Sequence, residues 1–275
     1  MPEICIGLKR HPDSFAKGAE VGDRLEADIC VGRSTMLTLG PQPFVAEFSI
    51  CPSGVPITLT PAFKNSSGGA AMTTKAHWET VYQTKKVDEV SWYRPHLETS
   101  LRLIEHAAPG TDSAVIDVGG GEATLVDDLV ALGYADVTVL DISPAAIDVA
   151  KGRLGASGAS VHWITGDITT VELEAARYHV WHDRAVFHFL TSADDRAAYM
   201  RQVARAVRLG GHVIVATFGL GGPEKCSGLD VVRYDAENLH GEFGPKFRLL
   251  ENVTELHETP WGTPQEFLYC FCRVE

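Results

Sequence analysis

A glycine triplet placed directly after a short apolar run constrains this chain more than any other feature. Residues 113–117 are small or β-branched and end in the carboxylate of Asp117, Gly119-Gly120-Gly121 follow, and a helical pattern begins at Glu122. Glycines are needed in such a turn because its backbone takes conformations closed to other residues and approaches a ligand closely. The segment predicts a buried strand, a tight turn and a helix N-terminus, with an ordinary surface turn as the alternative.

A second strand predicted over residues 136–141 favours the ligand-binding turn. It ends in Asp141, about 20 residues after Gly121, where α/β nucleotide-binding folds place the acid that binds ribose hydroxyls. Residues 143–154 then predict a helix, because serine is a good N-cap and proline a good first helical residue.

A third strand over residues 161–165 is followed by Asp167, so three predicted strands end at or beside Asp117, Asp141 and Asp167. The ends of parallel strands share one edge of the sheet, and ligands bind at that edge. Three carboxylates around one cleft repel an anionic ligand and suit a cationic one.

The cationic ligand that best fits this edge is S-adenosylmethionine (SAM), which carries a sulfonium and an ammonium. The dinucleotide fingerprint G-x-G-x-x-G/A requires a small residue at position 124, where this chain has Thr124. No basic residue stands nearby for a pyrophosphate, so an NAD-linked dehydrogenase is disfavoured.

Residues 117–123 resemble the D/E-x-G-x-G-x-G motif of class I SAM-dependent methyltransferases, with Ala123 in the last glycine position. The resemblance covers about residues 75–275. It implies an α/β fold with a Rossmann-like, seven-stranded, mostly parallel sheet and helices on both faces, and S-adenosyl-L-methionine as cofactor.

Carried over position by position, the resemblance implies how the cofactor is bound. Asp117 and Gly119 are expected to hold the methionine end, and Gly121 to lie under the sugar. Asp141 is expected to bind both ribose hydroxyls, with Ile142 against the adenine.

The same resemblance assigns the rest of the cofactor site. Asp167 is expected to accept a hydrogen bond from the adenine amino group, and Ile168 to pack on the ring. Gly120, His182 and Trp78 complete the predicted cofactor-binding set.

The aromatic segment before the first strand resembles the N-terminal part of the thiopurine methyltransferase-like group. Trp78 and Tyr82 match its W-x-x-x-[WY] spacing, and Trp92-Tyr93 follow. In that group these helices cover the cofactor and shape the acceptor pocket. Alternatively, Trp78 and Trp92 only anchor helices on the sheet, although adjacent Trp92 and Tyr93 cannot both face one core.

The fourth strand, predicted over residues 178–182, leads into a segment with two resemblances. Residues 181–184 are close to the W-D-R-x-x-L segment of the thiopurine methyltransferase-like group, with one residue inserted. Residues 183–189 fit the D-K-x-x-F/L-D-x-[IL] pattern of eukaryotic lysine methyltransferases of elongation factors almost as well. In both families this strand end borders the methyl group, so His188 is a candidate general base, with a structural histidine as the alternative.

The predicted acceptor pocket combines Trp92, Tyr93, Phe187 and Cys226. Cys226 lies in the Gly/Pro-bearing stretch 218–233, which is predicted to be a loop at the cofactor edge of the sheet. An apolar, aromatic pocket favours a small, soft or aromatic acceptor.

The remaining patterns complete the fold. A helix is predicted over residues 97–106 and another over 193–208, with the fifth strand at 212–217. Residues 247–257 and 265–273 are typical of a final antiparallel pair. Residues 1–70 are predicted to be a β-rich accessory segment of unknown role or a poorly ordered extension, joined to the methyltransferase domain (75–275) by a linker over 64–71.

Charge and cysteine usage narrow the partners and the compartment. The chain holds 36 acidic and 24 basic residues, a net charge of −12, which disfavours nucleic acid and anionic membranes as partners. Six cysteines without a C-x-x-C pair predict reduced thiols, no metal site and a cytoplasmic protein. Neither a signal peptide nor a transmembrane segment is expected.

Three functions stay open, in this order. The first is an enzyme that transfers the sulfonium methyl to a sulfur or nitrogen of a small molecule by in-line displacement. The alternative is a protein lysine methyltransferase. The third is a SAM-binding protein without turnover.

Overall fold

The computed structural model describes residues 67–275. The β-rich extension predicted over residues 1–70 lies outside the described residues, except at its end. There the helix α1 (Ser67–Thr84) begins. The predicted linker over residues 64–71 is therefore wrong from Ser67 onward, where the chain is helical.

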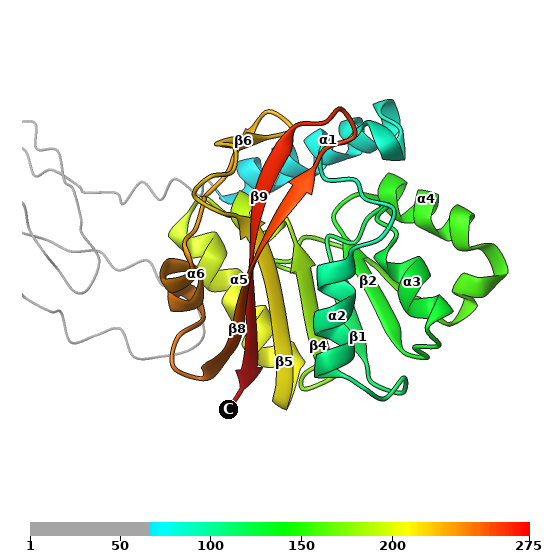
Figure 1. Ribbon diagram of the computed structural model, residues 1–275. Helices are drawn as coiled ribbons and strands as arrows, with labels where there is room; N and C mark the ends of the chain where they lie inside the picture. The colour runs from blue at the N-terminus through cyan, green and yellow to red at the C-terminus, as the bar shows by residue number, and fades with distance from the viewer. Residues whose placement is uncertain (1–66) are drawn as a thin grey trace, which may run out of the picture. The chain divides into compact units, whose positions relative to one another are not determined.

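A seven-stranded sheet forms the centre of the domain, in the order β3-β2-β1-β4-β5-β9-β8 (Figure 1). Strands β1 to β5 pair in parallel, and β9 is antiparallel to both β5 and β8. The strands are β1 (Val115–Val118), β2 (Val137–Asp141), β3 (His162–Thr165), β4 (Tyr178–Arg184), β5 (Val207–Phe218), β8 (Phe247–Glu258) and β9 (Pro264–Val274). The predicted Rossmann-like sheet is confirmed, including its final antiparallel pair.

Helices cover both faces of this sheet (Figure 1). Buried side chains of α2 (Glu98–Ala107) and α3 (Leu125–Ala131) pack on one face. Those of α5 (Ala193–Ala206) and α6 (Ala236–Phe243) pack on the other. The described residues also include α4 (Pro144–Leu154), 3-10 helices at Val87–Glu89, Gly155–Ser160 and Phe187–Phe189, and a small hairpin of β6 (Lys225–Cys226) and β7 (Leu229–Asp230). Within residues 67–275, no helix has the length and apolarity needed to cross a membrane.

Strand register brings polar side chains together at the carboxyl edge of the sheet. Asp117 in β1 stands beside His182 in β4, and Asp141 at the end of β2 stands beside Thr165 in β3. Ser143 caps α4 as predicted, because its hydroxyl accepts a hydrogen bond from the Ala146 amide. The predicted carboxylate-bearing edge is therefore present.

Two boundaries differ from the sequence-based expectation for local reasons. The helix after the glycine turn begins at Leu125 rather than Glu122, because the turn continues through an Ala123 N–H···O=C Gly120 bond. Thr124 donates its hydroxyl to the carbonyls of the segment before α2 instead of capping α3.

The second half of the domain also differs in detail. The helix predicted over 193–208 ends at Ala206, where β5 takes over. The stretch 218–233, predicted as a loop, contains the β6–β7 hairpin, and α6 follows it.

Candidate cofactor and acceptor site

The glycine turn after β1 is shaped so closely that side chains are excluded from it. Gly119 has φ +71° and Gly121 has φ +41°, which favour glycine. A Cβ at Gly119 would overlap the side chain of Val186. A Cβ at Gly121 would stand 2.8 Å from Asp141 Oδ2 and 3.2 Å from the Tyr82 hydroxyl. The turn therefore lets the backbone lie directly against a ligand and against α1.

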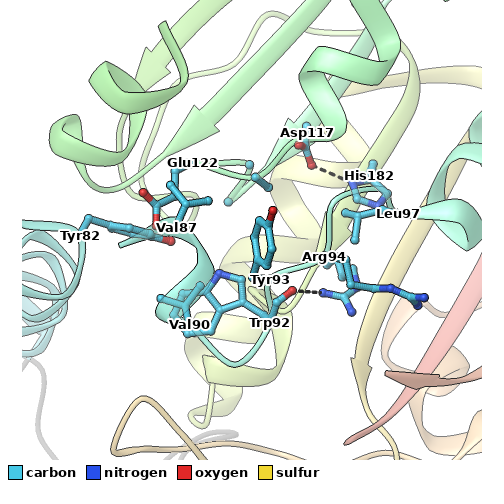
Figure 2. A pocket seen from close by; sticks show the side chains of 14 residues that line it. Tyr82, Val87, Val90, Trp92, Tyr93, Arg94, Leu97, Asp117, Glu122 and His182 are labelled. Atoms are coloured by element: carbon cyan, nitrogen blue, oxygen red, sulfur yellow. Dashed lines mark hydrogen bonds and ion pairs between the residues drawn. The ribbon is translucent and has the colours of Figure 1, made fainter. Parts of the chain in front are cut away.

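A pocket lies between this turn and the segment 87–97, which connects α1 to α2 (Figure 2). The empty space between its lining residues, open solvent included, is about 520 Å³. Its lining combines carboxylates, cations and aromatic rings. The polar and aromatic members are Tyr82, Trp92, Tyr93, Arg94, Asp117, Glu122, His182 and Arg184, with Gly119 and Gly120 in the floor.

Asp117 is held in place by a buried hydrogen-bond chain. Its Oδ1 lies 2.7 Å from His182 Nδ1, and His182 Nε2 lies 2.9 Å from the Ser100 hydroxyl. The Ser100 hydroxyl is in turn 3.3 Å from the Tyr269 hydroxyl on β9. Asp117 and His182 are 3% and 1% exposed. His182 thus connects the Asp117 carboxylate to Ser100 of α2 and, through it, to Tyr269 of β9.

Asp141 is a buried carboxylate at the end of β2. It accepts a hydrogen bond of 2.8 Å from the Ser143 amide. Burial, together with the negative charges of Asp117 and Glu122, raises the pKa of Asp141 to about 7. A cationic ligand at this edge relieves that repulsion.

Glu122 is a fourth acid of the edge, which the sequence did not single out. Its side chain lines the pocket although the residue is only 3% exposed. Its Oε1 has no hydrogen-bond partner among the described residues. Burial raises the pKa of Glu122 to about 7, against the opposing charge of Arg153.

The predicted adenine end lies at the same edge but outside this pocket. Asp167 Oδ1 accepts from the amide and the hydroxyl of Thr169, at 2.8 and 2.7 Å. Ile168 is buried and Ile142 is half-buried. Both follow strand ends next to Asp141, so the arrangement leaves room for the predicted roles.

The segment 87–97 is fastened over the pocket by contacts that the sequence did not reveal. His257 Nε2 donates to the Ser91 carbonyl at 2.7 Å, and Arg184 donates to the Trp92 carbonyl at 3.2 Å. Arg94 stands 3.5 Å from Glu255. We call this segment the strap.

Trp92 and Tyr93, two of the predicted acceptor residues, line the pocket from the strap. Trp78 does not line it. Its ring instead meets those of Tyr82, Trp92 and Phe189 at centroid distances of 6.0, 5.7 and 5.0 Å. Trp78 therefore supports the pocket wall from behind.

The predicted roles of Phe187 and His188 do not fit their positions, because both are fully buried and neither lines the pocket. Phe187 packs against Tyr199 in the core. His188 Nδ1 accepts a hydrogen bond from the Phe218 amide. Burial lowers the pKa of His188 to about 3, so its ring stays neutral and is a weak base at working pH.

Cys226 does not line the pocket either; it is buried in the core and hydrogen-bonds Ser91 of the strap. It is 5% exposed. Burial raises the pKa of the Cys226 thiol to about 11, which keeps it protonated and poorly nucleophilic. Its placement gives no support to the predicted contact with an acceptor.

The loop after β4 is organised by Asp183. Its carboxylate accepts from the amides of Val186 and Phe187, at 2.8 and 3.1 Å, and from the Tyr199 hydroxyl at 2.7 Å. Burial nevertheless raises the pKa of Asp183 to about 7. This acid fixes the loop that bears Val186, the side chain facing Gly119.

Comparisons with known proteins agree with this geometry. Residues 115–211 match the family described as methyltransferase domain. The chain is 21% identical over 198 residues to the EEF1A lysine methyltransferase 2 of Homo sapiens, covering 67% of this chain and 78% of that protein. It is 27% identical over 138 residues to the eEF1A lysine and N-terminal methyltransferase of Mus musculus, covering 50% of this chain and 19% of that protein.

A solved structure, titled for the conversion of a disulfide bond into a thioacetal group during echinomycin biosynthesis, shares the fold. Its TM-score is 0.60 at 20% identity, covering 74% of this chain and 93% of that one. The match of residues 115–211, the fold and the glycine turn support a class I SAM-dependent methyltransferase domain, with S-adenosylmethionine as its cofactor. The thiopurine methyltransferase-like subgroup is not confirmed.

Proposed function

We propose that this protein transfers the methyl group of SAM to a lysine amine of a protein substrate. When bound, SAM supplies an already activated methyl group. One observation carries the acceptor assignment: the rings of Tyr82, Trp92 and Tyr93 line the pocket beside the acids expected to face the cofactor. Such a lining suits a cationic side chain, because aromatic faces stabilise an ammonium.

The residues have separate roles in this proposal. Asp117, oriented by His182, and Asp141 hold the two ends of the cofactor. Trp92 and Tyr93 exclude water and align the amine with the S–CH₃ bond. A lysine must lose its proton before it attacks, so the neutral amine is the form that accepts the methyl group.

The similarity to two proteins named as lysine methyltransferases supports this choice over the small-molecule acceptor favoured by the sequence motifs. The net charge of −12 also suits a basic protein partner. Because the identities are low, the protein substrate itself is left open.

A small-molecule acceptor is the second candidate, and two cations in the lining favour it. Arg94 and Arg184 both line the pocket, and each lies 3.5 Å from the Glu255 carboxylate, while Arg94 also lies 3.6 Å from that of Glu98. Guanidinium groups in the lining suit an acceptor that carries an acidic group.

Incubation of the purified protein with methyl-labelled SAM and a size-fractionated cell extract separates these candidates. Our proposal predicts label in a protein band, and mass spectrometry locating one or more added methyls on lysine. Label confined to the small-molecule fraction would favour the second candidate. An Arg94→Ala variant should then lose activity on that small acceptor.

A further inference from the structure

We infer that Glu122 is the residue that recognises the sulfonium charge of SAM. No motif in the sequence assigns Glu122 a role. The inference rests on the SAM-dependent transfer proposed above, but not on the identity of the acceptor.

The first argument is that the Glu122 carboxylate lacks a partner where one is expected. A buried carboxylate is normally satisfied by hydrogen bonds or by a cation. Glu122 is 3% exposed, and its Oε1 has no partner within residues 75–275. The side chain nevertheless lines the pocket, so its missing partner can come from a ligand.

The nearby cation is already engaged elsewhere. Arg153 donates to the backbone carbonyls of Glu122 and Ala123, both at 2.8 Å. Its remaining donors bind the carboxylate of Asp127, at 2.6 to 3.1 Å. The Arg153 guanidinium therefore fixes the backbone of the turn and leaves the Glu122 carboxylate free for another positive group.

The second argument is the position of Glu122 between the two groups expected to hold the ends of the cofactor. In SAM, the sulfur is bonded to the ribose on one side and to the methionine chain on the other. Asp141 stands beside Gly121, the residue before Glu122, and is expected to bind the ribose. Asp117 is expected to bind the methionine ammonium, and Figure 2 shows Asp117 and Glu122 on either side of the space above the Tyr93 ring.

The third argument is mutual repulsion. The charges of Asp117 and Glu122 both raise the pKa of Asp141, so the three carboxylates are close enough to interact. Two of them have assigned partners in the cofactor, the ammonium and the ribose. The remaining acid, Glu122, is then matched by the sulfonium, which is the second positive charge of SAM.

This arrangement has a consequence for turnover. The positive charge that faces Glu122 is lost on methyl transfer, because the acceptor lone pair bonds the methyl carbon and the S–CH₃ electron pair stays on sulfur. The product S-adenosylhomocysteine is a neutral thioether at that position. Glu122 therefore makes the protein bind SAM more tightly than its product.

The test is calorimetric titration of wild type and Glu122→Gln with three ligands. SAM and sinefungin carry a positive charge at this position, and S-adenosylhomocysteine does not. Because the attraction between opposite charges in a buried site is lost, we expect Glu122→Gln to weaken the binding of SAM and of sinefungin about tenfold or more. S-adenosylhomocysteine should change by less than about twofold.

Two matched variants complete the experiment. Asp117→Asn should weaken the binding of all three ligands, because all three carry the methionine ammonium. Glu105→Gln, on the exposed face of α2, should change none of them. Thermal unfolding of each variant checks the fold, and Glu122→Gln should be at least as stable as wild type at pH 8, because a buried charge is removed.

Equal weakening of all three ligands by Glu122→Gln would overturn the inference, since the residue would then recognise the ammonium. Unchanged affinities would overturn it too, including the case where only turnover falls. Failure of the proposed function looks different, because wild type itself would then not bind SAM.

Discussion

Two buried acids of this domain, Glu122 and Asp183, have the same raised pKa of about 7 but opposite surroundings. Asp183 accepts three hydrogen bonds from the loop after β4 and from Tyr199. Glu122 has a carboxylate oxygen with no partner and faces a pocket. A shifted pKa therefore marks burial in both, and only the hydrogen-bond inventory separates an acid that holds the fold from one that awaits a ligand.

The largest effect is expected at the satisfied acid. Asp183→Ala leaves two amides and the Tyr199 hydroxyl without their acceptor, so we expect a loss of about 3 kcal/mol or more in the free energy of unfolding. Urea denaturation measures it. Asp183→Asn keeps one acceptor oxygen and should lose less. A loss below about 1 kcal/mol in the alanine variant would remove the distinction between the two acids.

At the ligand edge, substitution should affect binding rather than folding. Asp141→Ala should weaken the binding of SAM by about 1–3 kcal/mol, because it removes the hydrogen bonds expected to the ribose hydroxyls. Its thermal stability should change little, since the lost bond to the Ser143 amide is offset by removal of a buried acid. Unchanged SAM affinity in a folded variant would contradict our placement of the ribose.

The pH dependence of binding sharpens the same comparison. Asp141 and Glu122 have folded-state pKa values of about 7, above their unfolded values. Their contribution to stability is therefore full below about pH 4 and is lost as the pH rises through 7. Because SAM is cationic, it favours the ionised acids, so its affinity should rise between about pH 6 and 8 with release of protons.

Calorimetry in buffers of different ionisation enthalpy counts those protons. Uptake of protons on SAM binding, or an affinity that falls with rising pH, would show that these acids do not face the ligand. Asp183→Asn, measured where it remains folded, serves as the control and should leave the proton count unchanged, because Asp183 stays in its own network.

The smallest effect is expected where α1 meets α4. The Glu79 carboxylate accepts from the Ser143 hydroxyl at 2.7 Å, at the N-terminus of α4. Because the Glu79 side chain is partly exposed and glutamine keeps an acceptor oxygen for Ser143, Glu79→Gln should cost less than about 1 kcal/mol in the free energy of unfolding. Faster amide exchange in α1, without a change in overall stability, would be the visible result. Slower exchange would contradict the contact.

The sequence predicted the glycine turn and the strand-end acids because these depend on local spacing. The sequence placed Glu122 at the start of a helix. Neither the glycine pattern nor the helical periodicity shows that the turn continues to Thr124. The contact of His182 with Ser100 joins residues far apart in the chain, so it depends on sheet pairing and helix packing. His188 was a reasonable candidate base by residue type, but only the structure shows that it is buried.

The most direct test of the central claim, that the acid-lined edge binds the cation SAM, is parallel calorimetric titration of the wild-type protein with SAM and with NAD. We predict one SAM site per chain and no NAD binding, because buried acids line the edge and Thr124 stands where the dinucleotide fingerprint requires a small residue. Binding of NAD without SAM would contradict the account.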